Sequence, residues 1–179
     1  MILREASFED ATALAAIYAH HVLHGFGTFE ETPPSEEELG QRLAEVRARG
    51  LPWIVAEDEE GGALLGYAYA SPFRTRSAYR FTVEDSVYVA PEAQGRGVGR
   101  ALLAELIARC EALGARQMLA VIGDSANAAS IALHRAAGFE MSGTTRAVGY
   151  KAGRWVDIVS MQRALGPGAE EPPSGAGIF

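Results

Sequence analysis

Apolar residues recur at helical spacing in four stretches of the chain, which we predict to be its helices. A first helix begins at Ser7, with Asp10 placed to reach back to the cap. Ser35 and Glu38 form the capping box of a second helix, which stops near Gly50. Residues 97–113 and 127–137 make the third and fourth.

Short apolar or alternating runs predict the strands, at residues 2–5, 53–57, 64–70, 81–90, 117–122, 139–142 and 155–161. The run at 117–122 is continuously apolar, as in a strand buried on both faces. This order of elements favours one α/β domain over residues 1–165, a mixed sheet with helices on both faces. Residues 166–179 are rich in Pro and Gly, and we predict a disordered tail.

Composition narrows the function classes. The chain is 48% hydrophobic and has a formal charge of −7, which argues against nucleic acid or anionic membranes as partners. No run is long enough to span a membrane, and the first residues do not resemble a signal peptide. Cys110 is the only cysteine and falls on the apolar side of a predicted helix, so we expect a core thiol in a reducing cytoplasm.

A glycine-rich segment between a strand and a helix is the most specific local feature. Alternate glycines let backbone N–H groups turn toward an anion, and the following helix adds its positive end. Neither the P-loop pattern nor the dinucleotide-binding pattern fits the letters. We therefore predict a pyrophosphate cradle, with a plain turn as the alternative, over Gln94, Gly95, Arg96, Gly97, Val98, Gly99 and Arg100.

Three separated motifs resemble the GNAT family of N-acetyltransferases. They are Gln94-x-x-Gly97-x-Gly99, the preceding Val87-Tyr88-Val89, and the following Asn127-x-x-Ser130-x-x-x-His134. The resemblance spans residues 2–165. It implies a GNAT fold, with a mostly antiparallel twisted sheet of six to seven strands, and acetyl-CoA as cosubstrate without a metal.

Within that family the chain is similar to the phosphinothricin and methionine sulfoximine acetyltransferases, through residues 28–33, 82–89, 120–123 and 149–155. This resemblance implies a small anionic amino acid as the acceptor and a homodimer. Arg74, Arg76 and Arg80 would then capture the acceptor's acid group, the alternative being a solvated basic loop. Phe29 and Tyr79 would line an apolar slot, the alternative for Phe29 being ordinary packing within its loop.

Glu84 is the predicted general base, because a carboxylate on a strand beside apolar residues can be partly desolvated, and the resemblance implies the same role at this position. The alternative is an exposed carboxylate at the end of a strand. Asp85 points to the opposite face by strand alternation, and we expect it to be solvated. His134 stands where many relatives carry a tyrosine that protonates the sulfur. For His134 we leave open an acid role, a substrate contact and a structural role.

The other coenzyme contacts come from the resemblance. Val87, Tyr88 and Val89 would bind the pantetheine arm through their backbone, with Tyr88 also filling the core. Asn127 and Ser130 would bind the same arm, the alternative for Asn127 being a helix cap.

His20 and His24 share a helical face, but no third ligand has suitable spacing, so we predict no metal site.

Three functions remain at this stage. The first is acetylation of a small anionic amino acid by direct attack of its amine on acetyl-CoA. The second is acetylation of another amine, either a protein N-terminus or a metabolite. The third is a non-catalytic module that binds acyl-CoA.

Overall fold

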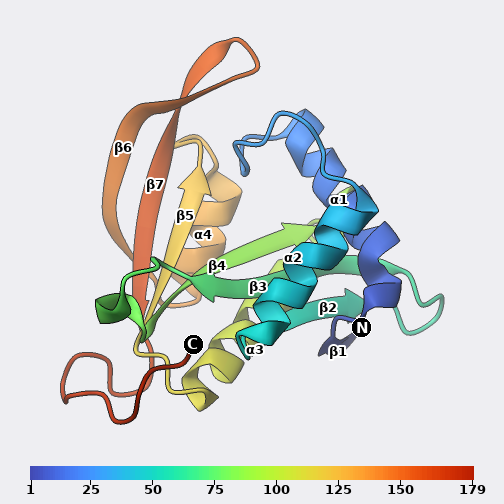
Figure 1. The fold of residues 1–179 in the computed structure, drawn as a ribbon. Coiled ribbons are helices and arrows are strands. Elements are labelled where there is room, and N and C mark those ends of the chain that lie inside the picture. The colour runs from blue at the N-terminus through green and yellow to red at the C-terminus, as the bar shows by residue number, and fades with distance from the viewer.

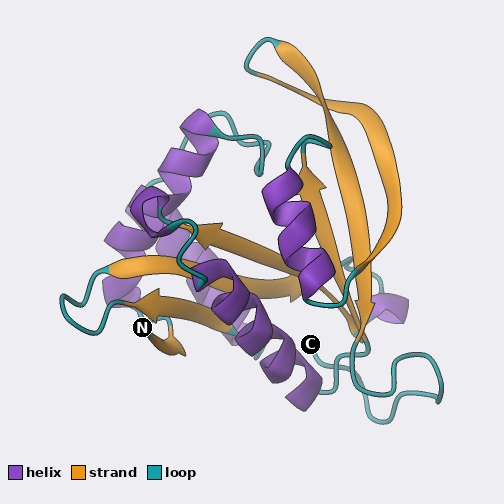
Figure 2. Cartoon of the chain, turned by 180° about the vertical axis from the view of Figure 1, so that it is seen from behind, coloured by secondary structure: helices purple, strands orange, loops and turns teal.

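A seven-stranded sheet organises the computed structural model, which describes residues 1–179. Figure 1 shows α1 and α2 in front of this sheet, and Figure 2, seen from behind, shows α3 and α4 on the other face. The elements are β1 (Ile2–Glu5), α1 (Ala11–His24), α2 (Glu36–Ala48), β2 (Trp53–Glu57), β3 (Leu64–Pro72), β4 (Thr82–Val89), α3 (Val98–Ala112), β5 (Gln117–Gly123), α4 (Ala128–Ala136), β6 (Glu140–Lys151) and β7 (Arg154–Ala164).

The strands lie in the order β1-β2-β3-β4-β5-β7-β6. Every neighbouring pair is antiparallel except β4 and β5, which are parallel. The mixed, mostly antiparallel sheet with helices on both faces is therefore confirmed. The parallel pair is short, running only from Thr82↔Gln117 to Asp85↔Ala120, and beyond it the two strands diverge.

The core lies between the sheet and its helices. On α3, the predicted apolar face is confirmed, since Leu103, Leu106, Ile107 and Cys110 are all buried. Burial raises the pKa of the Cys110 thiol to about 12, so this thiol is a neutral core group. No helix is both long enough and apolar enough to cross a bilayer.

Two strands differ from the sequence prediction. In β5 only Met118, Ala120 and the end of the strand are buried, whereas Leu119 and Val121 are half-buried, so burial on both faces was wrong. One side of β5 faces a cleft, as described below. The predicted 139–142 strand extends to Lys151, because pairing with β7 holds this exposed edge strand where hydrophobic patterning gives no signal.

The chain after Leu165 forms no helix or strand. The Ile178 N–H donates to Arg80 O (3.0 Å), and Arg116 donates to the carbonyl oxygens of Glu171 and Pro172. The division into a domain at 1–165 and a disordered tail at 166–179 stays a prediction.

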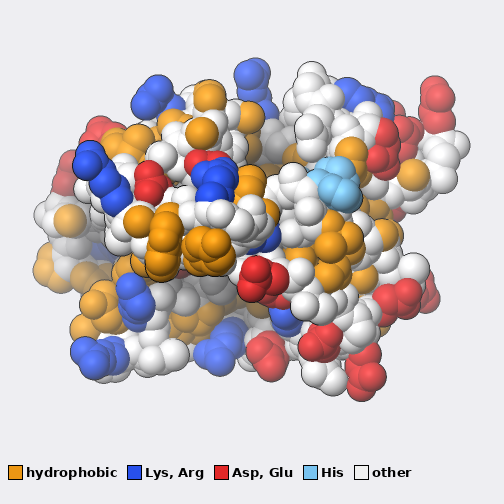
Figure 3. Space-filling model, turned by 90° about the horizontal axis from the view of Figure 1, so that it is seen from above, with side chains coloured by type: hydrophobic (Ala, Val, Ile, Leu, Met, Phe, Trp, Pro, Cys, Tyr) orange, Lys and Arg blue, Asp and Glu red, His pale blue; other side chains and the backbone are white.

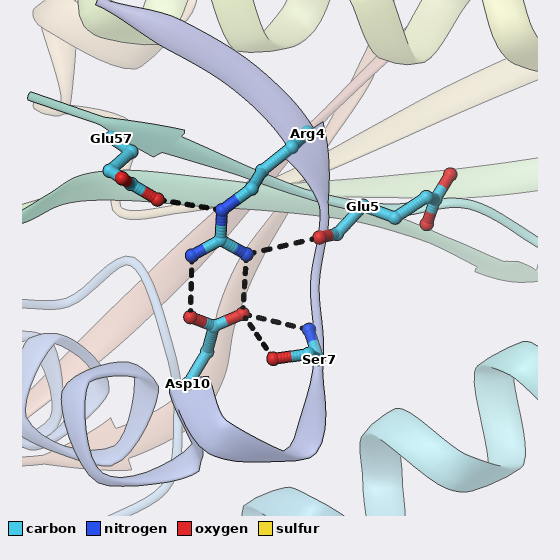
Figure 4. Close-up of polar contacts among 5 residues, drawn as sticks. All are labelled: Arg4, Glu5, Ser7, Asp10 and Glu57. Carbon is cyan, nitrogen blue, oxygen red and sulfur yellow. Dashed lines mark hydrogen bonds and ion pairs between the residues drawn. The ribbon is translucent and has the colours of Figure 1, made fainter. Parts of the chain in front are cut away.

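A charged cluster fixes the start of the chain to the sheet (Figure 4). The Arg4 guanidinium donates two hydrogen bonds to Asp10, both 2.8 Å, and one to Glu57 (2.6 Å). Asp10 also accepts from the Ser7 N–H (2.7 Å), which confirms its predicted reach back to the helix cap. The hydrogen bonds from Arg4 are the main cause that lowers the pKa of Asp10.

We expect Asp10→Asn to lower the free energy of unfolding by about 1.5–3 kcal/mol at pH 7, since it removes charged hydrogen bonds from a buried group. Because the folded pKa of Asp10 is lowered, its stabilisation is present above the unfolded value of about 3.9 and is lost as pH falls through the folded pKa. Urea unfolding of both proteins across pH would show the gap closing in acid. Glu9→Gln, an exposed neighbour, is the control.

Candidate active site

The divergence of β4 and β5 opens a cleft of about 1150 Å³. This exceeds the roughly 300–1,000 Å³ of most small-ligand sites, so the cleft can take a ligand as large as a coenzyme. Its walls come from four places: the diverging strands, the C-terminal end of α1 with the following loop, the segment before α3, and one side of α4.

The backbone of β4 presents hydrogen-bonding groups to this cleft. At the two ends of the strand, Ala90 N–H donates to Leu65 O (2.9 Å) and Phe73 N–H donates to Thr82 O (3.2 Å). The even-numbered residues of β4 thus pair with β3, and the odd-numbered ones turn toward β5. Beyond Asp85 there is no β5 partner, so the main-chain groups of Val87 and Val89 face the gap.

One of these groups is already satisfied by a side chain. His21 Nε2 lies 2.9 Å from Val89 O, and a carbonyl only accepts, so the ring donates. Burial lowers the pKa of His21, which keeps the ring neutral. The Tyr88 ring packs against the rings of Tyr18, Tyr67 and His21. Tyr88 therefore fills the core, as predicted, and also forms part of the cleft wall.

The glycine-rich segment forms the second wall. Gly95 and Gly97 have φ of 74° and 83°, the left-handed region that glycine adopts without strain. The first α3 hydrogen bond runs from Ala101 N–H to Gly97 O, so the amides of Val98, Gly99 and Arg100 have no helical acceptor and are free for an anion. The segment as a whole lines the cleft except for Arg96, which pairs with Asp58 (3.4 Å).

Glu84 lies on β4 at the edge of this cleft and is half-buried. Burial raises the pKa of its carboxyl, the charge of Asp85 adds to the rise, and Arg74 opposes it. A carboxylate whose pKa is raised toward neutral pH is suited to accept a proton.

Asp85 was predicted to be solvated, and this was wrong: it is only 7% exposed. Its Oδ2 lies 2.9 Å from His134 Nε2. Alternation was applied correctly, but the opposite face of β4 is covered by α3 and α4 (Figure 2). That coverage could not be read from local sequence.

His134 has protein partners at both ring nitrogens. Its Nδ1 lies 2.8 Å from Ser130 O, which only accepts, and its Nε2 faces the Asp85 carboxylate. An imidazolium satisfies both contacts. Burial opposes that charge, but the Asp85 hydrogen bond and charge outweigh it and raise the pKa of His134. The ring is 4% exposed, and His134 and Asp85 are both among the residues that line the cleft, so the three alternatives for His134 stay predictions.

Asn127 caps α4, as its alternative interpretation expected. Its Oδ1 accepts from Ser130 N–H (3.2 Å) and its amide donates to Gly123 O (3.4 Å). Asn127 and Ser130 both line the cleft.

The arginines and the tyrosine predicted to bind the acceptor do not line the cleft. Arg74, Arg76 and Tyr79 are exposed on the loop before β4 and, like Arg80, lie outside the residues that line the cleft. Of these, only Arg74 affects the pKa of Glu84.

The surface seen from above carries basic, acidic and apolar side chains that are interspersed with one another, and a histidine is exposed there (Figure 3).

Phe29 lines a second, smaller cavity of about 330 Å³ together with Gly27, Val121, Gly123, Val148 and Ile158. Val121, Gly123 and Gly27 belong to both cavities, so the smaller one adjoins the main cleft. His20 and His24 lie in the cleft wall with ring centroids 4.9 Å apart, and no group of three potential metal ligands is present.

Residues 14–139 match the model of the acetyltransferase (GNAT) family. The chain is a GNAT acetyltransferase. It is 56% identical over 160 residues to a phosphinothricin N-acetyltransferase of Alcaligenes faecalis, covering 89% of this chain and 80% of that protein. It is 43% identical to an L-methionine sulfoximine/L-methionine sulfone acetyltransferase of Pseudomonas aeruginosa, covering 95% and 98%.

The crystal structure of a GNAT superfamily phosphinothricin acetyltransferase from Sinorhizobium meliloti in complex with acetyl-CoA superposes with a TM-score of 0.94. The two chains are 53% identical, with 98% of this chain and 94% of that one covered. The GNAT fold is thus confirmed, and the chain is an acetyl-CoA-dependent N-acetyltransferase. The free amides in the first turn of α3 and the unpaired β4 backbone have the hydrogen-bonding groups that the coenzyme's phosphates and amide-containing arm require.

Sequence reasoning missed three groups in the acetyltransferase: His21, the 25–28 segment and Asp85 as the partner of His134. His21 was not among the predicted site residues, and nothing in its neighbourhood along the sequence signals the bond to Val89. The one available signal for Asp85 was that two acidic residues are adjacent at 84–85. Neighbouring side chains point to opposite faces of a strand, so if both faces of β4 were covered, both carboxylates would be buried.

We expect Asp85→Asn to lower the pKa of His134 below about 6.5, because burial of the ring is then no longer outweighed by a carboxylate. The raised folded pKa of the wild type gives stability that is present below the unfolded value and lost as pH rises through the folded pKa. The variant should therefore lose more stability at pH 6 than at pH 9.

Histidine NMR titration measures the change directly, with the His20 and His24 signals as references within the same molecule. An unchanged His134 titration in the variant would contradict the assigned ion pair.

Proposed function

We propose that the enzyme acetylates the amine of a small anionic amino acid of the phosphinothricin, methionine sulfoximine or methionine sulfone type. The relatives named above support this substrate class. The observation that carries the proposal is the half-buried Glu84, whose pKa is raised, at the edge of a cleft with unpaired backbone groups.

Acetyl-CoA supplies the acetyl group as a thioester. The amine nitrogen bonds to the acetyl carbon, the carbon–sulfur bond breaks with its electron pair going to sulfur, and Glu84 takes the proton lost from nitrogen. The main chain of Val87 and Val89 holds the pantetheine arm, and the amides of residues 98–100 hold the diphosphate. Asn127 and Ser130 border the same arm.

The departing thiolate needs little help, because a free thiol has a pKa of only about 8.5. Both ring nitrogens of His134 already have partners in Ser130 and Asp85, so we assign no proton transfer to this side chain. The reaction in this form is a direct transfer without an acyl-enzyme. Cys110 is buried and neutral and takes no part in it.

For the acceptor's acid group we assign Arg74 first, since it is the arginine whose charge acts on Glu84. Arg76 and Arg80 lie on the same loop, and Phe73 and Tyr79 pack edge to face there, 5.6 Å between ring centroids. Phe29 forms the apolar wall of the adjoining cavity. A cationic acceptor would be disfavoured by this loop.

We also propose a homodimer in the cytoplasm. β6 is an edge strand, and β6 and β7 carry exposed apolar side chains, including Tyr150 (59% exposed) and Trp155 (64%). Exposed edges with apolar side chains mark association surfaces. The single buried cysteine suits a reducing compartment.

A panel of amines tests the acceptor, with thiol release as the readout. We expect methionine sulfoximine, methionine sulfone and phosphinothricin to have the highest kcat/KM. A higher value for a peptide N-terminus or a polyamine would overturn the substrate class.

Glu84→Gln should lower kcat about 10²–10⁴-fold, because the proton acceptor is lost, while affinity for acetyl-CoA is retained. In the wild type, the acidic limb of the pH profile should lie above the ordinary glutamate pKa of about 4.3. Arg74→Ala, the matched variant, should move this limb to still higher pH, since Arg74 lowers the pKa of Glu84. Near-normal kcat in Glu84→Gln across pH would remove Glu84 from the mechanism.

Trp155→Glu should shift the protein from dimer to monomer in sedimentation experiments, because it places a charge on the apolar hairpin surface. Leu113→Glu, at the exposed residue that follows α3, is the control. A wild-type monomer at micromolar concentration would refute the dimer.

A further inference from the structure

The loop between α1 and α2 crosses the open end of the cleft. Gly25, Gly27 and Thr28 line the main cleft, and Gly27 and Phe29 line the smaller cavity. Figures 1 and 2 show this loop reaching from the upper end of α1 toward β5 and the β6–β7 hairpin. We call residues 25–28 the roof of the cleft, because they and Glu84 line the same cavity.

A buried lysine ties this roof to the hairpin. Lys151, at the end of β6, is 6% exposed, and its Nζ donates to Gly25 O (2.9 Å) and Thr28 O (2.8 Å). It forms no ion pair, since the nearest acidic residues, Glu30 and Glu31, act on it only through space. Burying an amine is costly unless its hydrogen bonds are made, so the two loop carbonyls hold this side chain in place.

The remaining loop contacts converge on the same hairpin. The Arg154 guanidinium lies 3.9 Å from the Phe26 ring centroid and pairs with Asp124. The Phe29 ring lies against Gly149, where a Cβ would overlap it. Lys151 and Arg154 are cross-strand partners on either side of the Ala152–Gly153 turn, so the tip of one hairpin holds successive parts of the loop.

We propose that Lys151 is a positioning residue that holds residues 25–28 as the roof of the acceptor pocket and thereby sets the affinity for the acceptor amine. This inference rests on the proposed acceptor site, but the anchoring itself does not depend on which amine is the substrate. The amides assigned to the coenzyme's diphosphate lie in the first turn of α3, and Lys151 contacts only carbonyls of the loop, so we expect acetyl-CoA affinity to depend little on Lys151.

The first experiment compares Lys151→Met with the wild type, using methionine sulfoximine as acceptor. Methionine keeps the apolar length of the side chain and removes both hydrogen bonds. We expect the acceptor KM to rise about tenfold or more, with the acetyl-CoA Kd unchanged within about twofold. Lys151→Arg, which can still donate to both carbonyls, should recover part of the loss. Equal losses for both ligands, or no loss for either, would overturn the proposal.

The second experiment uses the fact that Lys151 is the only lysine in the chain. An amine-reactive ester followed by mass spectrometry reports how often its amine is released, with the Met1 amine as an internal reference. We expect Lys151 to react at least about tenfold more slowly than Met1. Arg154→Ala, which keeps Lys151 but loosens the loop, should accelerate Lys151 labelling several-fold and leave Met1 labelling unchanged.

Labelling of Lys151 as fast as that of Met1 in the wild type would refute the anchor, even if Lys151→Met fails to fold. If no amine in the panel were acetylated, the proposed function would fail, whereas the labelling result would still decide whether Lys151 holds the loop.

Discussion

The short pairing of β4 with β5 is the constraint on which the active site depends. Four residue pairs join these strands, from Thr82↔Gln117 to Asp85↔Ala120, and then the strands separate. Unpaired backbone groups inside a protein are costly, so a sheet that opens in this way needs another partner for them. His21 meets one of them at Val89, and we propose the coenzyme arm as the partner of the rest.

The same divergence gives two adjacent carboxylates different chemistry. Glu84 and Asp85 are neighbours on β4, yet they point to opposite faces. Glu84 reaches the edge of the cleft without a hydrogen-bonding partner, and burial together with the Asp85 charge raises its pKa. Asp85 turns toward α4 and is balanced by His134, an ion pair that fixes the helix bordering the cleft to the strand where the sheet opens.

Much of the fold could be predicted because it follows from local patterns. The capping residues Ser7 and Ser35, the apolar stripe of α3 and the positive-φ glycines at 95 and 97 act within a few residues of themselves. The long β6 strand was missed because its exposed sequence has no apolar alternation, and only its pairing with β7 makes it a strand. The pairing of Arg96 with Asp58 could not be predicted for the same reason, because Asp58 lies in the distant turn between β2 and β3 and only the folded chain brings the two side chains together.

The sequence alone predicted the family, through the resemblance of three motifs, and the match of residues 14–139 to the family model confirmed it. It also predicted a pyrophosphate cradle and a carboxylate base, because both predictions rest on neighbouring residues whose backbone and charge properties can be read locally. The tertiary structure decided what surrounds these groups: that Asp85 is buried against His134, that the arginines of the 74–80 loop lie beside the cleft and do not line it, and that Lys151 reaches across to the loop after α1. These contacts join residues 49 and 126 positions apart, and burial and charge at such a distance arise only when the chain has packed.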